Sequence, residues 1–391
     1  MAKTIFKLRH QVPAPLTSQI DNTKDSWGLW SSNNQLPPQK FTTSRYSVTR
    51  HLKLLKSSRV NCLSRDHYHA MTNPSKWLFN HTMLRIKDPT RSINFYKLLG
   101  MSEINKIEQP DAKFDLYFLG YDGPQSIHPK GSHWTDRQGL LELTHNYGTE
   151  NDSNFKVANG NEDPTKGFGH IAISVDNIQA ACARLLEADI PFQKKLTDGR
   201  MRNIAFAKDP DGYWVEIVPL NPLEKTEELK ETDTGKYRFN HSMLRIKDPE
   251  VSLKFYQEVM GMKLLHVKEN PSADFNLYFL GYGAEPTVPA HPDSLPIVDR
   301  EGILELTWNY GTEKKEGQIY HDGNSEPQGF GHICVSVDDL DQACEYLEGK
   351  DVRWKKRLTD GRMKSVGFLL DPDGYWIEIV QNQGLKKTMN W

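Results

Sequence analysis

Histidine and glutamate side chains recur in this chain as two complete sets, each within blocks of sequence that occur twice. The first copy holds His81, Glu142, His170 and Glu216, and the second holds His241, Glu305, His332 and Glu378. Taken singly, a histidine or glutamate in a strand is usually a structural or solvated residue. Two imidazoles and two carboxylates brought together would suit a borderline divalent ion such as Zn²⁺ or Ni²⁺.

The glutamates stand in strongly apolar surroundings. Glu142 lies between Leu141 and Leu143, and the same pattern surrounds the other three glutamates. Alternate residues of a strand share a face, so Glu216 shares its face with Trp214 and Val218. An acid on such a face needs a partner, and a metal cation is one possibility. The alternative is a set of unrelated polar residues preserved by recent duplication, although segments 125–138 and 285–301 have diverged widely.

The repeated blocks follow one another in the same order in both copies. They are Phe79–Pro89 and Phe239–Pro249, Leu141–Glu150 and Leu304–Glu313, Gly167–Ile171 and Gly329–Ile333, Leu196–Met201 and Leu358–Met363, and Asp209–Val218 and Asp371–Val380. An offset of about 160 residues is too long for a solenoid period and indicates a duplicated domain.

Hydrophobic periodicity and turn residues predict an α+β fold of four βαβββ modules, two in each repeat. Helices are expected at 90–99, 177–188 with Asp176 as N-cap, 249–260 and 339–348. Strands are expected at 81–86, 114–119, 140–144, 170–175, 204–207 and 213–218, and in the second repeat at 276–280, 303–307, 332–337, 365–369 and 375–380. The predicted domains are 77–223 and 237–383, joined by a linker at 224–236.

Composition narrows the class of protein. The 391 residues carry a formal net charge of −2, so no broad electrostatic field favours nucleic acid. The four cysteines show no CxxC spacing, which suits a reducing compartment and disfavours a thiolate metal site. No apolar run approaches the roughly 20 residues of a membrane span.

Residues 1–75 differ from the remainder of the chain. Up to Ala70 there are eleven Lys or Arg residues against three acidic ones, with frequent Ser, Thr, Pro and Asn. This composition favours a disordered basic tail that is dispensable for chemistry. A mitochondrial targeting segment is the alternative, and a cytoplasmic location is expected otherwise.

The repeated blocks closely resemble those of glyoxalase I (lactoylglutathione lyase), specifically its fused two-domain fungal form, over residues 77–383. The resemblance implies two tandem vicinal-oxygen-chelate domains with cupped sheets and a site between the domains. His81 and Glu142 would then join His332 and Glu378 in one site, and His241 and Glu305 would join His170 and Glu216 in the other. Both copies have His at the first ligand position, where many eukaryotic members have Gln, so the metal identity stays open.

The resemblance also implies roles for individual residues. Glu216 and Glu378 would be the principal bases, with Glu142 and Glu305 serving the other face of the substrate. The implied glutathione contacts are Arg85, Asn146, Lys356 and Met363 in one site and Arg245, Asn309, Lys166, Lys194 and Met201 in the other. Gln328 stands where the first repeat has Lys166, which predicts weaker glutathione binding in the site that contains Gln328.

The implied reaction isomerises the hemithioacetal of methylglyoxal and glutathione to S-lactoylglutathione through a metal-stabilised enediolate. Two divalent ions per chain are expected, with Zn²⁺ or Ni²⁺ as candidates and glutathione as cosubstrate. An extradiol-type dioxygenase and a metal-free binding protein on the same fold are the alternatives. Because duplication supplies the domain interface within one chain, a monomer with no nucleic-acid or membrane partner is expected.

Overall fold

The order strand, helix and three strands occurs four times in the folded chain. The computed structural model describes residues 72–124, 126–199, 201–220, 231–283, 297–361 and 363–388. Almost all of the predicted tail and the first half of the predicted linker lie outside the described residues. None of the helices within these described ranges is long and apolar enough to cross a membrane.

The first repeat contains two modules. The first module comprises β1 (Leu78–Ile86), α1 (Pro89–Leu98), β2 (Ser102–Gln109), β3 (Phe114–Gly120) and β4 (Leu140–Asn146). The second module comprises β5 (Phe168–Val175), α2 (Ile178–Glu187), β6 (Phe192–Lys194), β7 (Ala205–Lys208) and β8 (Trp214–Pro219).

The second repeat has the same order of elements. The third module comprises β9 (Arg238–Ile246), α3 (Pro249–Lys254), β10 (Lys263–Asn270), β11 (Phe275–Gly281) and β12 (Ile303–Asn309). The fourth module comprises β13 (Phe330–Val337), α4 (Leu340–Gly349), β14 (Arg353–Lys356), β15 (Val366–Leu370) and β16 (Trp376–Gln381), and α5 (Gln383–Thr388) follows it. The four predicted βαβββ modules are confirmed.

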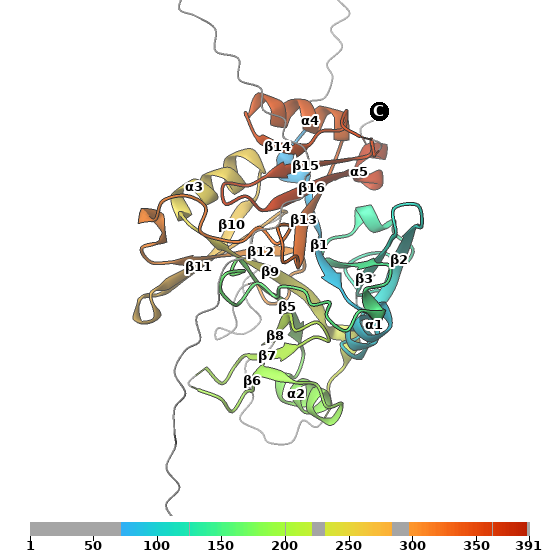
Figure 1. Cartoon of the computed structure of the whole chain (residues 1–391), viewed down its shortest axis with the longest axis vertical. Coiled ribbons are helices and arrows are strands. Elements are labelled where there is room, and N and C mark those ends of the chain that lie inside the picture. The colour runs from blue at the N-terminus through green and yellow to red at the C-terminus, as the bar shows by residue number, and fades with distance from the viewer. Residues whose placement is uncertain are drawn as a thin grey trace, which may run out of the picture. The chain divides into compact units, whose positions relative to one another are not determined.

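Each sheet combines one module from each repeat (Figure 1). The first sheet has the strand order β14-β15-β16-β13-β1-β4-β3-β2, and the second has the order β10-β11-β12-β9-β5-β8-β7-β6. The repeats meet where β1 pairs with β13 and where β5 pairs with β9, both antiparallel. The described part of both repeats therefore belongs to one compact unit.

The four edge strands of the two sheets, β2, β6, β10 and β14, were not predicted from the sequence. β2 has the sequence Ser-Glu-Ile-Asn-Lys-Ile-Glu-Gln, and none of its side chains is buried. It pairs with β3 only, whereas β10 pairs only with β11. An edge strand with polar side chains gives no apolar alternation to recognise.

Two helix predictions were wrong in detail. The helix expected at 249–260 is regular only to Lys254, and a π-helical turn at Phe255–Val259 continues it. The N-cap of α2 is Asn177, whose side chain accepts from Ala180 N at 3.1 Å. Asp176 instead accepts a hydrogen bond from Asp233 N at 3.0 Å, so its carboxylate anchors the segment between the repeats.

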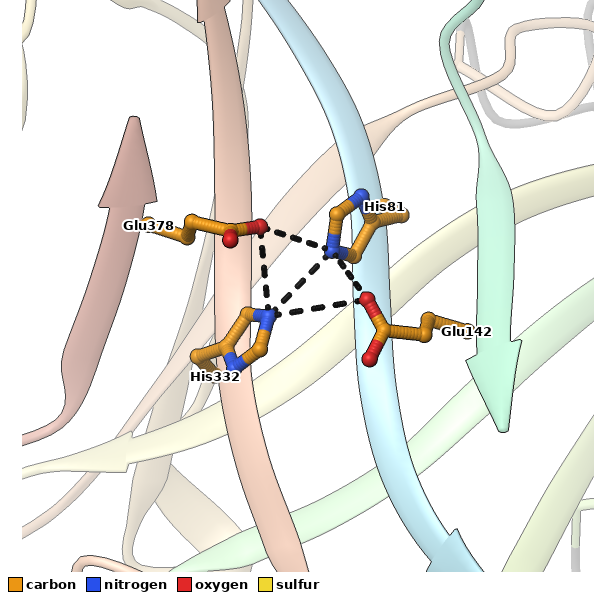
Figure 2. A group of neighbouring side chains, drawn as sticks. All are labelled: His81, Glu142, His332 and Glu378. Carbon is orange, nitrogen blue, oxygen red and sulfur yellow. Dashed lines mark hydrogen bonds and ion pairs between the residues drawn. The ribbon is translucent and has the colours of Figure 1, made fainter. Parts of the chain in front are cut away.

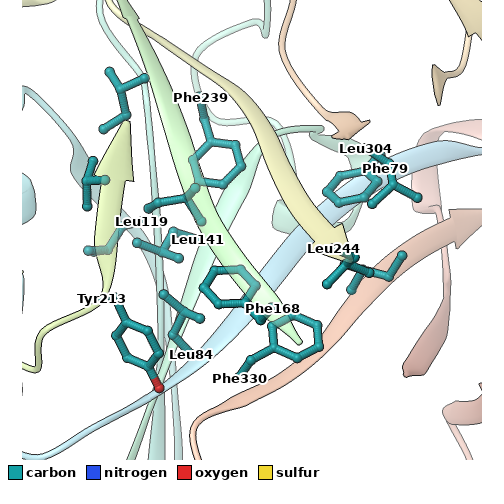
Figure 3. Close-up of a cluster of buried hydrophobic side chains, with 14 of the residues drawn as sticks. Phe79, Leu84, Leu119, Leu141, Phe168, Tyr213, Phe239, Leu244, Leu304 and Phe330 are labelled. Carbon is teal, nitrogen blue, oxygen red and sulfur yellow. The ribbon is translucent and has the colours of Figure 1, made fainter. Parts of the chain in front are cut away.

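The hydrophobic core is built from both repeats (Figure 3). Phe168 and Phe330 stack with ring centroids 5.0 Å apart. The glycine that precedes each of these rings is required by close packing. A Cβ on Gly167 would lie 2.2 Å from His321 O, and one on Gly329 would lie 1.9 Å from Ala158 O. The Gly-Phe-Gly block therefore serves packing between the repeats as well as the site.

The Asp-Pro-Asp-Gly turns are structural anchors. Asp209 is buried and accepts from Tyr96 Oη at 3.0 Å and from Tyr213 N at 2.9 Å. Asp211 accepts from Lys87 N at 3.0 Å, which joins this turn to the end of β1. Burial raises the pKa of Asp209 to about 7, with Asp211 contributing. Asp371 and its neighbours repeat the arrangement in the second half.

Candidate functional site: two four-residue histidine and glutamate clusters

Four of the predicted residues converge on the first sheet (Figure 2). His81 Nε2 lies 3.0 Å from Glu142 Oε2 and 3.2 Å from Glu378 Oε2. The Nε2 atoms of His81 and His332 are 3.2 Å apart. All four side chains belong to buried residues, and their candidate ligand atoms lie within 4.8 Å of one another. We call this cluster site A.

The other four predicted residues form the same cluster on the second sheet, which we call site B. His241 Nε2 lies 3.0 Å from Glu305 Oε2 and 3.2 Å from Glu216 Oε2. The Nε2 atoms of His170 and His241 are 3.3 Å apart. Each cluster takes two residues from each repeat. Their role as metal ligands stays a prediction.

The strand pattern explains why these side chains meet. Site A draws on β16, β13, β1 and β4, which are consecutive in the first sheet, and site B draws on β12, β9, β5 and β8 of the second. Leu141 and Leu143, the neighbours of Glu142, are buried in the hydrophobic core. Because successive strand residues point to opposite faces, burying these neighbours directs the glutamate towards the other face. The remaining three glutamates are flanked by core residues in the same way.

An asparagine next to the first histidine of each cluster sets the orientation of that imidazole. Asn80 Oδ1 lies 2.7 Å from His81 Nδ1, and Asn240 repeats this contact with His241. Asn80 is fixed in turn, because its Nδ2 donates to Trp134 O and Arg137 O. When the imidazole is neutral, Nδ1–H donates to the asparagine, so the lone pair is on Nε2, which faces the cluster centre. This role of the asparagine was not identified from the sequence, although the repeated Phe-Asn-His sequence places an asparagine before the histidine in both copies.

A threonine holds one glutamate in each cluster. Thr144 Oγ1 donates to Glu142 Oε1 at 3.0 Å, and Thr307 Oγ1 donates to Glu305 Oε1 at 3.1 Å. These residues are two apart on one strand and so share a face. Within the described ranges, no hydroxyl holds Glu216 or Glu378. The two carboxylates of each cluster are therefore anchored differently.

Burial and close contact between histidines and glutamates shift the pKa values of side chains in both clusters. Burial alone would lower the pKa of His81, but hydrogen bonds with Glu142 and Glu378 outweigh it and raise the pKa to about 9. His241 behaves alike and has a pKa of about 9. Burial would raise the pKa of Glu378, but the two histidines hold it well below its ordinary value. Such a cluster of anionic carboxylates favours a positive charge at its centre.

The predicted substrate contacts lie around the clusters. The guanidinium of Arg85 donates to Asn324 Oδ1 at 2.7 Å and to the carbonyl of Phe330 at 3.2 Å. Arg245 makes the equivalent bonds to Asn161 and Phe168. Each arginine thereby fastens the loop that leads into the strand of the partner histidine. Contact with substrate stays a prediction for both.

The predicted lysine contacts bind loop carbonyls. Lys194 Nζ donates to Ile204 O at 2.9 Å, and Lys356 Nζ donates to Val366 O at 2.8 Å. Both also bind the carbonyl of the methionine named as a contact, Met201 or Met363. Their side chains thus hold the Leu-Thr-Asp-Gly-Arg-Met loops at the sheet edge. Lys166 Nζ instead lies 3.6 Å from Asp163 Oδ2.

A cavity of about 400 Å³ opens over site B. Its lining includes the four cluster residues together with Arg245, Asn309 and Met201 among the predicted contacts. Asn309 Nδ2 also donates to Tyr320 Oη at 3.1 Å. In the first repeat, Asn146 occupies the corresponding end of β4. Lys166 and Lys194 do not line this cavity, whereas Lys268, which the sequence did not single out, does.

Known proteins share this sequence and architecture. The model of the Glyoxalase/Bleomycin resistance protein/Dioxygenase superfamily matches residues 78–217 and 238–379. A lactoylglutathione lyase of Schizosaccharomyces pombe is 45% identical over 314 residues, covering 80% of this chain and 99% of the relative. Glyoxalase I of Saccharomyces cerevisiae is 45% identical over 317 residues, covering 79% of this chain and 94% of the relative.

The chain belongs to the glyoxalase I family. A crystal structure of glyoxalase I from Zea mays matches the fold with a TM-score of 0.58 at 26% identity, covering 80% of this chain and 95% of that chain. The expected fold class, two tandem vicinal-oxygen-chelate domains, is thereby confirmed.

Glyoxalase I enzymes are metal-dependent, and the clusters have the chemistry of a metal site. Each offers two imidazole nitrogens and two carboxylate oxygens, a donor set that suits borderline divalent ions. The asparagine on Nδ1 leaves Nε2 of the first histidine available for a cation. His81, Glu142, His332 and Glu378 would hold one ion, and the site B residues would hold a second.

In this glyoxalase I family member, we expect Asn80→Ala to weaken metal binding at site A by roughly 10- to 100-fold, because His81 loses its orienting acceptor. Competition with a chromogenic chelator would measure both sites. Asn240→Ala is the matched variant and should weaken site B instead. If the Asn80→Ala variant bound metal at site A as tightly as the unmodified chain does, Asn80 would not have the orienting role given to it.

Proposed function

We propose that this chain is a lactoylglutathione lyase that isomerises the hemithioacetal of glutathione and methylglyoxal to S-D-lactoylglutathione. The observation that carries the proposal is the pair of buried clusters, each with two histidines and two glutamates, in a chain of the glyoxalase I family. The biological role that follows is methylglyoxal detoxification.

The reaction moves hydrogen between two adjacent carbons. The C1–H proton of the hemithioacetal leaves to a base, and a proton is returned to C2. The C1 hydroxyl becomes the thioester carbonyl as the C2 carbonyl becomes a hydroxyl, so the atoms balance without an oxidant. A divalent ion in the cluster supplies Lewis-acid stabilisation to the oxygens of the hemithioacetal.

The two glutamates of each site are held differently, which supports different catalytic roles for them. Glu142 is held by Thr144, and only 4% of its side chain is exposed. No hydroxyl in the described part of the chain donates to Glu378, which has the Cys334 thiol, a weaker donor, as a hydrogen-bond partner, and its side chain is 11% exposed. A base must reach the substrate carbon, so the less restrained carboxylate is better placed to move. Glu378 is thus the principal base of site A, and Glu216 is its counterpart in site B. The threonine-bound glutamates Glu142 and Glu305 serve the other face of the substrate.

We assign Zn²⁺ to the two sites, with Ni²⁺ as the alternative, and glutathione as cosubstrate. Arg85 and Arg245 are suited to a substrate carboxylate, because a guanidinium fork matches two oxygens. Asn146 and Asn309 would hydrogen-bond the peptide, and Lys356 and Lys194 the glycyl carboxylate. Met363, Met201 and Lys166 complete the proposed contacts.

Each cluster is completed within one chain, which supports a monomeric enzyme. Light scattering at assay concentration tests this state. For location we propose the cytoplasm. A fusion of residues 1–70 to a reporter tests the alternative of mitochondrial import.

One assay separates the proposal from the other activities of the superfamily. The purified chain is mixed with methylglyoxal and glutathione, and thioester absorbance is followed against a sample without glutathione. The lyase requires glutathione and consumes no O₂. Activity with a catechol and O₂ would indicate a dioxygenase, and binding without turnover would indicate a sequestering protein.

Metal loading should release protons and reach two equivalents per chain. His81 and His241 have pKa values of about 9, so in metal-free protein at pH 7 these imidazoles are protonated. Metal binding needs the neutral nitrogen, and about one proton per ion should leave at pH 7, with the release vanishing as the pH rises above about 9. Calorimetric titration in buffers of different ionisation enthalpy measures this. Proton release that is independent of pH would contradict the assignment.

A further inference from the structure

The two sites differ along one edge, although their clusters match. In the second sheet, Lys268 lies in register with Leu277, Thr307 and Arg245 across β10, β11, β12 and β9. In the first sheet, the same row across β2, β3, β4 and β1 is Ile107, Leu116, Thr144 and Arg85. Lys268 and Ile107 therefore occupy equivalent places, and this exchange replaces an apolar side chain by a cation.

The neighbouring wall also differs. The carbonyls of Trp134 and Ile297 accept equivalent hydrogen bonds from Asn80 and Asn240, so these two residues correspond. In site A the indole of Trp134 stacks on Phe118 at 4.4 Å and lies 6.2 Å from the His81 ring. In site B, Ile297 packs with Leu265, Phe279 and Ile303. Site A thus has an indole and an isoleucine at the two positions where site B has an isoleucine and a lysine.

Lys268 has the surroundings of a ligand contact. It is half-buried and lines the cavity over site B. Among the described residues, no carboxylate forms an ion pair with its ammonium, whereas Arg245 is hydrogen-bonded to Asn161 and to loop carbonyls. The acids among the described lining residues, Glu216 and Glu305, both belong to the cluster. A cavity-lining cation without a counterion attracts an anion.

Sheet order indicates which part of the substrate reaches Lys268. The proposed glutathione contacts Lys194 and Met201 belong to β6 and the loop after it, at one edge of the sheet. Lys268 is on β10, at the opposite edge, with the cluster strands between them. A hemithioacetal that extends its glutathione part towards β6 directs the aldehyde side chain towards β10.

We propose that Lys268 makes site B selective for 2-oxoaldehydes whose side chain carries an anionic group, while the Ile107 and Trp134 wall confines site A to apolar side chains. The inference rests on the proposed lyase activity. The two sites of one chain would then divide a range of 2-oxoaldehydes between them.

The test uses phenylglyoxal and 4-carboxyphenylglyoxal, each with glutathione. Both are aryl 2-oxoaldehydes, and they differ only in the carboxylate on the ring. Glu378→Gln leaves site B as the working site, and Glu216→Gln leaves site A. The measured quantity is kcat/KM for the carboxylated substrate divided by kcat/KM for the parent. We call the Glu378→Gln variant the site B protein and the Glu216→Gln variant the site A protein. The ratio should be at least about tenfold higher in the site B protein, because only site B offers a charge-assisted hydrogen bond to the carboxylate of the substrate.

Two reciprocal substitutions complete the test. Lys268→Ile in the site B protein should lower the ratio to that of site A, and Ile107→Lys in the site A protein should raise it. Lys268→Gln serves as a second loss variant if the isoleucine variant does not fold. Equal loss with both substrates would mean that Lys268 contacts glutathione, which overturns the proposal. Absence of turnover with methylglyoxal in the unmodified chain would instead reject the lyase assignment itself.

Discussion

Replacing Glu216 and Glu378 together by glutamine should lower kcat/KM for the methylglyoxal hemithioacetal by roughly a thousandfold. Glutamine keeps the shape and can still offer an oxygen to a metal, but it cannot accept the C1 proton. Each single substitution should leave the other cluster working, because the two clusters lie on different sheets. Steady-state kinetics with parallel metal analysis separates loss of the base from loss of the ion.

The matched control is Glu301→Gln. Glu301 is also buried, and burial raises its pKa to about 8, so this carboxyl is largely neutral at pH 7. It belongs to neither cluster. The control should retain activity, because the substitution removes no charge at that pH. If the double variant stayed active while holding both metals, the two carboxylates would not be the bases.

Two double substitutions distinguish crossed sites from sites confined to one repeat. Glu142→Gln with Glu378→Gln alters both carboxylates of site A and should leave about half the activity, because separated sites contribute independently. Glu142→Gln with Glu216→Gln alters one carboxylate in each site. Although both residues lie in the first repeat, this variant should lose at least about tenfold.

Strand pairing between the repeats is the physical basis of both expected results. β1 pairs with β13 and β5 pairs with β9, so each cluster is assembled across a joint between the two halves of the chain. Confinement of each site to one repeat would reverse the order of the two variants. Kinetics on the intact chain, with thermal unfolding measured alongside, makes the comparison without relying on isolated halves. The outcome that would falsify crossed sites is therefore the survival of activity in Glu142→Gln with Glu216→Gln.

The modules and the candidate ligands could be predicted from the amino-acid sequence alone. Repeated blocks marked the duplication, and the apolar surroundings of Glu142 and Glu216 indicated strand carboxylates that need a partner such as a metal cation. Pro89 and Gly100 marked the bounds of α1 to within a residue or two. These signals are local, because strand alternation and helix termini depend on residues a few positions apart.

Contacts between residues far apart in the chain, and the exposure of individual side chains, could be identified only in the tertiary structure. The edge strands β2 and β10 each pair with one neighbouring strand, and nothing in their own sequence shows that pairing. Asp176 and Asn177 could each cap α2, and the contact of Asp176 with residue 233 decided between them. Lys268 resembles any surface lysine until the sheet register places it in one row with Leu277, Thr307 and Arg245, at the cavity over site B. Such contacts join segments tens to hundreds of residues apart, so only the folded chain decides which groups meet.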